Sequence, residues 1–199
     1  MTARTTRALL MLAAFFTSLV LVFAVVMMVV GRDRGTATTQ AAAVGGPFRL
    51  IDQDGKPLSD QDLKGRPFLV FFGFINCPDI CPTTLFEMSE VLSRLGPDAD
   101  RVRGLFITID PERDTPDKLK DYLSSFDPHL IGVTGDPNAI AAAAKAYRVY
   151  TKKVPLEGGN YTMDHTTIVY LMDKEGRFVA PFSLKRRPEE SAADLRRYL

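Results

Sequence analysis

The chain has 199 residues, and its 25 lysines and arginines almost balance its 24 aspartates and glutamates, giving a formal net charge of +1. This balance does not indicate a nucleic-acid-binding protein, which would normally carry a clear excess of positive charge. The chain contains only two cysteines and two histidines, so few combinations of these residues could form a metal or redox site.

An uncharged apolar run occupies residues 8–30 near the start of the chain. An α-helix of this length, rising about 1.5 Å per residue, would cross the roughly 30 Å hydrocarbon core of a membrane. A cleavable signal peptide has a shorter apolar region, of about 7–15 residues, and a small-x-small site soon after it. The first such site here is around Ala41–Ala43, so the pattern favours an uncleaved transmembrane anchor.

The charges beside this run indicate its orientation. Arg4 and Arg7 precede it with no nearby acid, whereas Asp33 partly offsets the two arginines that follow the run. The positive-inside rule counts lysines and arginines rather than net charge, so the asymmetry is small. It favours residues 1–7 in the cytoplasm and an exported C-terminal part. We therefore expect a single-pass protein of the bacterial inner membrane with its domain in the periplasm, and a mitochondrial inner membrane is the alternative.

Residues 31–46 are small, polar and without periodicity, which predicts a flexible tether. The remaining part, residues 47–199, has the size of one domain, for which about 150 residues is usual. A domain of this size buries enough surface to fold without disulfide bonds. We interpret a small basic cluster near the C-terminus as a solvated surface, with a docking patch for an acidic partner or lipid headgroups as the alternative. The cluster consists of Lys185, Arg186, Arg187, Arg196 and Arg197.

The domain begins with a predicted hairpin over residues 47–67 that turns at Asp54-Gly55. The continuous apolar run at 68–75 predicts a central strand covered on both faces. A helix is predicted from Pro82 to a stop at Gly96-Pro97. The pattern then predicts a strand at 102–110, a helix at 115–126, a strand at 130–135, a helix at 136–150, an inserted loop or hairpin at 154–165, a hairpin formed by 166–173 and 177–183, and a helix at 188–199.

This alternation of strands and helices predicts an α/β domain with a parallel core sheet, to which the late hairpin adds antiparallel strands. The order of elements resembles the thioredoxin fold, here with an inserted hairpin and one N-terminal transmembrane helix before it. In such sheets, ligands and reactive groups gather at the carboxyl ends of the strands. The segment directly after strand 68–75 is therefore the expected place for chemistry.

Both cysteines lie in this segment, in NCPDICP, with Cys81 four residues after Cys77. A helix N-terminus stabilises a thiolate, so we expect a depressed pKa for Cys81. The two sulfurs can face the same way, within reach of a disulfide or a shared metal ion. A purely structural disulfide would close a very small loop and contribute little stability. A redox couple and a metal site remain as the main alternatives.

A histidine provides the third group. His165 directly precedes the strand predicted at 166–173, and in a thioredoxin-like sheet the loop before that strand passes beside the cysteine loop. We therefore expect His165 to face Cys77 and Cys81. Two thiolates and one imidazole form a soft ligand set that suits copper, and zinc is the main competing metal. His129 lies in a connector and is interpreted as a surface or capping residue.

Three neighbouring residues could support such a site. Asp164 could orient the His165 ring or supply a weak oxygen ligand, and a loop acid bound to backbone is the alternative interpretation. Asp79 lies between the cysteines and is interpreted as a turn former rather than a ligand. Met163 could offer a thioether, with ordinary packing as the alternative.

Four separated segments resemble the Sco/SenC family, over essentially the whole exported domain, and the N-terminal anchor matches as well. The resemblance implies a thioredoxin fold with an extra hairpin and one copper ion bound by Cys77, Cys81 and His165. One departure is Ile75-Asn76, where family members often carry Thr-Phe or a similar pair, and it changes no ligand. The four segments are GFINCPDICPTTL (73–85), TIDPERDTPDKLKDY (108–122), AAAKAYRVYTKK (142–153) and YTMDHTTIVYLMDKEGRF (161–178).

The resemblance also implies a function, that of a copper chaperone without catalytic turnover. Such a protein receives copper, as Cu(I) and also as Cu(II), from an upstream donor protein. It helps to assemble the dinuclear copper centre of cytochrome c oxidase subunit II. The alternative is a membrane-tethered thiol–disulfide oxidoreductase with Cys77 and Cys81 as its redox couple and His165 only tuning the thiols. A peroxide reductase is disfavoured, because Phe74 stands where its Thr-x-x-Cys pattern requires threonine.

The segment at 110–116, DPERDTP, has no obvious ligand role. We expect it to form a loop near the site. Within that loop, Arg113 is expected to pair with Asp110 or Asp114.

Overall fold

The computed structural model describes residues 15–28 and 44–199. Residues 15–28 form a helix with exposed side chains. Within the described residues, no helix has both the length and the hydropathy that crossing a membrane requires. The predicted anchor at 8–30 extends beyond the described residues at both ends. The predicted tether at 31–46 lies mostly outside the described residues, and the predicted cytoplasmic N-terminus, residues 1–7, lies wholly outside them. The chain divides into two units, of which Ala43–Leu199 is the larger.

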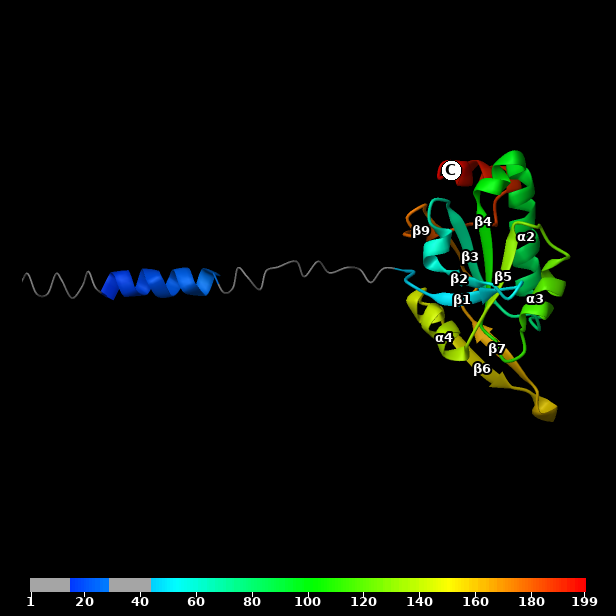
Figure 1. Cartoon of the computed structure of the whole chain (residues 1–199), viewed down its shortest axis with the longest axis horizontal. Coiled ribbons are helices and arrows are strands. Elements are labelled where there is room, and N and C mark those ends of the chain that lie inside the picture. Colours follow the sequence, from blue (N-terminus) through cyan, green and yellow to red (C-terminus); the bar gives the residue numbers. More distant parts are fainter. Residues whose placement is uncertain (1–14, 29–43) are drawn as a thin grey trace, which may run out of the picture. The chain divides into compact units, whose positions relative to one another are not determined.

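Three parallel strands form the centre of a seven-stranded sheet with the order β2-β1-β5-β4-β3-β8-β9 (Figure 1). They are β3 (Phe68–Gly73), β4 (Arg103–Thr108) and β5 (Leu130–Thr134), and each lies within a predicted strand. Every residue of β3 is buried, as expected for an apolar strand covered on both faces. Because these strands run parallel, the loops that follow β3 and β4 lie at the same edge of the sheet.

Antiparallel strands extend the sheet on both sides. On one side β8 (Val169–Met172) pairs with β3, and β9 (Phe178–Pro181) pairs with β8. On the other side β1 (Arg49–Asp52) pairs with β5, and β2 (Pro57–Ser59) pairs with β1. The turn between β1 and β2 contains Gly55, whose positive φ of 75° suits a glycine. These pairings confirm the predicted parallel core with antiparallel additions.

Two helices cover one face of the sheet. Helix α2 (Ile80–Leu95) packs on Gly104 of β4, and α3 (Pro116–Leu123) packs on Gly132 of β5, where the missing side chains leave room for the helices. Helix α2 begins two residues before the predicted Pro82, which places Cys81 within its first turn.

The opposite face is covered by α4 (Pro137–Ala146). Tyr147 follows this helix and packs on Phe72 of β3, with ring centroids 5.3 Å apart. The helix predicted over 136–150 is too long, because Arg148 adopts a left-handed φ of 57° that ends it. Helix α5 (Pro188–Arg196) packs against α2. Short 3-10 turns occur at Asp60–Leu63, Gly96–Arg101 and Glu157–Gly159.

The inserted segment forms a hairpin of its own. Strands β6 (Thr151–Pro155) and β7 (Tyr161–His165) pair antiparallel, with Thr151 opposite His165 at the base. Among residues 44–199, these two strands pair only with each other, so they form a second, two-stranded sheet. Figure 1 shows this hairpin beside the lower end of α4. It confirms the predicted hairpin but begins three residues earlier than expected.

The predicted basic cluster is largely neutralised by acids. Each of its four arginines forms a salt bridge with a carboxylate, which fits the interpretation as a solvated surface rather than a free basic patch. The pairs are Arg186–Asp194, Arg197–Asp194, Arg187–Glu190 and Arg196–Asp98.

Candidate metal centre

The candidate site lies at the carboxyl end of β3, where the chain turns into α2. Cys77 lies in the connecting loop, Cys81 is in the first turn of α2, and His165 is the last residue of β7. One ligand atom from each of these three residues lies within 4.8 Å of the other two. The structure therefore confirms the predicted convergence of the histidine with the cysteine pair.

The two sulfur atoms have different surroundings. Cys81 is fully buried, and its Sγ lies 3.7 Å from Nε2 of His165. Cys77 is 9% exposed, and its Sγ accepts a hydrogen bond of 3.4 Å from the backbone N–H of Cys81. Both are free thiols. An N–H group of the first helical turn is thus directed at the sulfur of Cys77 rather than that of Cys81.

The predicted depression of the Cys81 pKa is wrong. Burial raises the pKa of the Cys81 thiol, because a thiolate there would lose its hydration. A hydrogen bond from the backbone of Phe74 opposes this effect, while the neighbouring Cys77 and Asp114 add to it. Cys81 does lie in the first turn of a helix, as predicted, but the loss of hydration on burial outweighs the stabilisation that the helix N-terminus gives a thiolate. A cation bound between the sulfurs would favour the thiolate form and offset this cost.

Gly73, the last residue of β3, allows this close packing. A Cβ at this position would lie 2.8 Å from Sγ of Cys81 and 2.6 Å from the ring of Phe106. The strand end and the buried thiol can therefore approach each other only if residue 73 lacks a side chain. Sequence analysis missed this role, although a single glycine in the run FLVFFGFI was a visible signal.

The hydrogen bonds of His165 define its tautomer. Its Nδ1 lies 2.9 Å from the carbonyl oxygen of Thr166, which can only accept, so Nδ1 carries the proton. The lone pair of Nε2 then points toward Cys81. Burial lowers the pKa of His165, so the ring is neutral at neutral pH. The rings of Phe71 and Phe74 pack beside it, with centroids 6.3 and 5.9 Å away.

This carbonyl of Thr166 is the partner that orients the ring, and sequence analysis missed it. Asp164 is exposed and alternates with His165 along β7, so the two side chains point to opposite faces of the strand. Its role in supporting the site remains a prediction. Asp79 precedes α2 at the N-cap position, is exposed, and makes no side-chain capping bond with the described helix. Met163 packs against the hydrophobic core.

The second histidine lies at the other end of the sheet. The carbonyl of His129 accepts a hydrogen bond from the backbone N–H of Gly104, at the start of β4 and far from the cysteines. Its Nδ1 lies 2.6 Å from Asp127, and its Nε2 lies 3.1 Å from Asp100. This agrees with the interpretation of His129 as a surface or capping residue in a connector.

The donor set fits a soft metal ion. Two thiol sulfurs and one neutral imidazole nitrogen converge among aromatic rings, and thiolate with imidazole is a combination that copper and zinc both accept. Three protein ligands suit Cu(I), whereas zinc normally requires a fourth. Cys77 and His165 are partly exposed, so a bound ion would be reached from their side.

The fold and the site together define a class of protein, a thioredoxin-like α/β domain in which two thiols and one imidazole meet at the end of a central strand. The SCO1/SenC family model matches residues 36–199, and the chain belongs to this family. A relative, the SCO2-like protein of Rickettsia felis, is 41% identical over 149 residues, covering 74% of this chain and 73% of its own.

Solved structures show the same fold. The structure of Bradyrhizobium japonicum ScoI with copper bound is 64% identical in sequence, with a TM-score of 0.78, and the match covers 79% of this chain and 100% of that one. BsSco, in which a disulfide switch was identified, is described as a member of the Sco family of cytochrome c oxidase assembly proteins. It is 26% identical, with a TM-score of 0.63, and the match covers 78% of this chain and 93% of that one.

Proposed function

We propose that this protein binds one copper ion through Cys77, Cys81 and His165 and provides it for the assembly of cytochrome c oxidase. The observation that carries the proposal is the convergence of two thiols and an imidazole whose Nε2 lone pair is directed at Cys81. The copper-bound ScoI of Bradyrhizobium japonicum, which is 64% identical to this chain, supports copper as the metal.

The chemistry of the site favours Cu(I). Copper needs both sulfurs reduced, and it displaces the thiol proton that burial holds on Cys81. The resulting thiolates, with neutral His165, provide three ligands and leave room for a ligand from an acceptor protein to approach the ion. Cu(II) would need a weak additional ligand. Asp164, the sequence-based candidate, points to the opposite face of β7 from His165, so this ligand would have to come from elsewhere.

The acceptor that we propose is the dinuclear copper centre of cytochrome c oxidase subunit II, and an upstream donor protein supplies the copper. Membership in a family that includes cytochrome c oxidase assembly proteins supports the oxidase as partner. We further propose that residues 8–30 anchor the chain in the bacterial inner membrane, with residues 1–7 in the cytoplasm and residues 31–46 as a tether to the periplasmic domain, residues 47–199. The apolar run and its flanking charges support this arrangement.

A second candidate function is reduction of a disulfide in the acceptor. The adjacent free thiols of Cys77 and Cys81 favour it, and BsSco provides a related case of a disulfide switch. In this reaction one thiolate attacks the acceptor disulfide, and the second then resolves the mixed disulfide. The two cysteines become oxidised, and the two acceptor sulfurs become reduced.

One experiment separates the two functions. The copper-loaded protein is mixed with the reduced, metal-free copper domain of subunit II, and the metal-free reduced protein is mixed with the oxidised form of that domain. Copper delivery predicts that the absorption of the mixed-valence dinuclear centre develops in the first mixture once a one-electron oxidant such as ferricyanide is added. It also predicts that a Cys81→Ser variant produces no such change. If only the second mixture reacts, and the protein retains its copper in the first, the reductase function replaces the chaperone function.

A further inference from the structure

The strand that carries His165 is not part of the main sheet. Among residues 44–199, β6 and β7 pair only with each other, so no ladder of hydrogen bonds fixes the hairpin to the strand that precedes the cysteines. At the base of the hairpin, the Thr166 N–H and hydroxyl both bond to the backbone of Tyr150. This contact joins only the two residues that flank the hairpin, so other contacts must hold His165 opposite Cys81.

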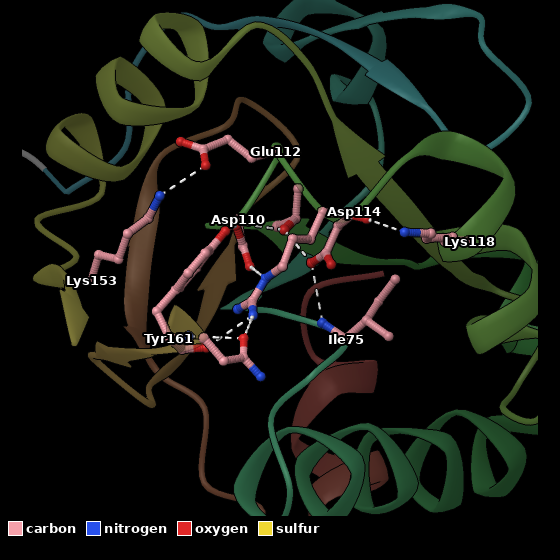
Figure 2. Close-up of polar contacts among 10 residues, drawn as sticks. Ile75, Asp110, Glu112, Asp114, Lys118, Lys153 and Tyr161 are labelled. Atoms are coloured by element: carbon pink, nitrogen blue, oxygen red, sulfur yellow. Dashed lines mark hydrogen bonds and ion pairs between the residues drawn. The ribbon is translucent and has the colours of Figure 1, made fainter. Parts of the chain in front are cut away.

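Residues 110–114, which we call the brace, follow β4 and lie between the cysteine loop and the hairpin. Toward the cysteine loop, the brace presents Asp114, which is only 1% exposed. Its Oδ2 accepts a hydrogen bond of 3.1 Å from the backbone N–H of Ile75 and one of 2.6 Å from the hydroxyl of Thr108 (Figure 2). Ile75 lies two residues before Cys77, so this carboxylate fixes the start of the cysteine loop.

The brace is itself held firmly by short-range hydrogen bonds. The N–H of Asp114 donates to the carbonyl of Asp110 over 3.0 Å, and the N–H of Asp110 donates to the Thr108 hydroxyl over 2.9 Å. The hydroxyl of Thr134, on β5, donates to the carbonyl of Asp114 over 3.0 Å. The two aspartates therefore have fixed positions relative to two central strands, and buried networks satisfied in this way are rigid.

Toward the hairpin, the brace presents Asp110 and Arg113, which form an ion pair with each other. Asp110 accepts a hydrogen bond of 2.8 Å from the hydroxyl of Tyr161. Arg113 donates to the carbonyl of Tyr161 over 2.9 Å, and its guanidinium lies 3.7 Å from the centroid of that ring. Tyr161 begins β7 and His165 ends it, so both side chains point to the same face of the strand.

A second, exposed contact runs beside this one. Lys153 of β6 forms an ion pair of 2.8 Å with Glu112, and its Nζ lies 4.1 Å from the centroid of the Tyr161 ring (Figure 2). Both side chains are largely exposed, and exposed pairs of this kind contribute little. The less exposed contacts of Asp110, Arg113 and Asp114 are therefore the polar contacts that connect the hairpin to the cysteine loop. They act beside the packing of His165 on Phe74.

We propose that the brace sets the position of His165 relative to the two cysteines, with Arg113 and Asp114 as positioning residues. Arg113 acts through Tyr161 on the hairpin, and Asp114 acts through Ile75 on the cysteine loop. The inference rests on the proposed copper function, because a metal site of three ligands requires their separation to be set before the ion arrives. Without the brace, the hairpin would move about its base and the three donors would no longer be preorganised.

The test uses the full chain and the variants Arg113→Ala, Asp114→Ala and the double variant. Arg177→Ala is the matched control, because Arg177 forms an Arg–Asp pair of 2.8 Å with Asp173 at the opposite end of the sheet. The first readout is the affinity for Cu(I), measured by competition with a chromophoric chelator and normalised to folded protein. We expect each brace variant to weaken binding at least tenfold. The fold-loss of copper affinity in the double variant should be smaller than the product of the two single fold-losses, because both residues act through the same brace.

The second readout needs no copper. The chain has only two histidines, so carbon-13 labelling at the ring Cε1 position gives one signal for each histidine. In the reduced metal-free protein, the brace variants should shift or broaden the His165 signal, while the His129 signal and both signals of Arg177→Ala stay in place. Tyr161→Phe, which removes only one hydroxyl, should give a smaller change of the same kind if a larger substitution prevents folding.

The possible results distinguish failure of the brace proposal from failure of the proposed copper function. Wild-type protein that binds no copper contradicts the proposed function, and the histidine signals still test the brace. If Arg113→Ala and Asp114→Ala match Arg177→Ala in both copper affinity and the His165 signal, the brace has no positioning role and the proposal is overturned.

Discussion

Nε2 of His165 lies 3.7 Å from Sγ of Cys81, although 84 residues separate the two in the chain. The imidazole carries its proton on the far nitrogen, bonded to the Thr166 carbonyl, so a lone pair and a buried thiol face each other. A thiol that burial keeps protonated and a nitrogen that is free to coordinate form a site in which a metal ion can replace the proton.

The different surroundings of the two thiols predict different reactivity. We expect iodoacetamide to modify Cys77 roughly ten times or more faster than Cys81 in the reduced protein, because the thiolate is the reactive form and burial suppresses it at Cys81. Digestion and mass spectrometry after brief labelling would measure the two rates. Equal rates, or faster modification of Cys81, would show that its sulfur is not buried in solution.

The close contact at the end of β3 predicts that Gly73→Ala damages both stability and the site. The new methyl group would meet Phe106 at 2.6 Å and Sγ of Cys81 at 2.8 Å. Overpacking of this kind costs about 1–3 kcal/mol, and relief by movement of Cys81 would displace its sulfur. Urea denaturation and copper competition would measure the two effects.

Gly46→Ala is a suitable control for this experiment, since its methyl group would meet only that of Ala146, at 3.2 Å. We expect it to leave copper affinity unchanged. A Gly73→Ala protein with wild-type stability and copper affinity would be inconsistent with the packing described for Cys81.

The contacts of His129 predict a pH-dependent contribution to stability. Burial opposes the charged ring, but the hydrogen bonds to Asp127 and Asp100 outweigh it and raise the pKa of His129. A histidine in the unfolded chain has a pKa of about 6.5. Because the folded-state pKa is higher, the contribution is fully present below about pH 6.5 and is lost as pH rises through the folded value.

Urea denaturation of wild type and His129→Gln between acidic and mildly alkaline pH would test this. The difference between their free energies of unfolding should be largest at the acidic end and should shrink as pH increases. A difference that stays constant, or grows with pH, would mean that the ring is not charged between its two carboxylates.

The sequence was sufficient to predict the fold and the meeting of the three candidate ligands. The apolar run at 68–75 and the alternation of strand and helix patterns predicted a parallel core, and a parallel core brings loop ends to one edge. The resemblance to the thioredoxin fold, in which the loop before strand 166–173 passes beside the cysteine loop, then predicted the convergence of His165 with Cys77 and Cys81, and the structure confirms it.

What the sequence did not reveal depends on packing between distant segments. The position of Cys81 in the first helical turn suggested a stabilised thiolate, but its burial beside Gly73 reverses that effect. The partner of His165 is a backbone carbonyl, which every residue possesses, so no residue type identified it. Similarly, the expected pairing of Arg113 with Asp110 is confirmed, while the contact from Asp114 to the backbone of Ile75 left no trace in the sequence.

Copper binding by the reduced protein tests the central claim most directly, with stoichiometry and affinity compared between wild type and His165→Ala. We expect about one copper ion per chain for the wild type, and for His165→Ala a dissociation constant at least tenfold higher, equivalent to about 1.4 kcal/mol. The Cys77–Cys81 disulfide should still form in the variant on oxidation, showing that the cysteine loop is intact. Full copper affinity in His165→Ala, or no copper bound by the wild type, would contradict the proposed three-ligand site.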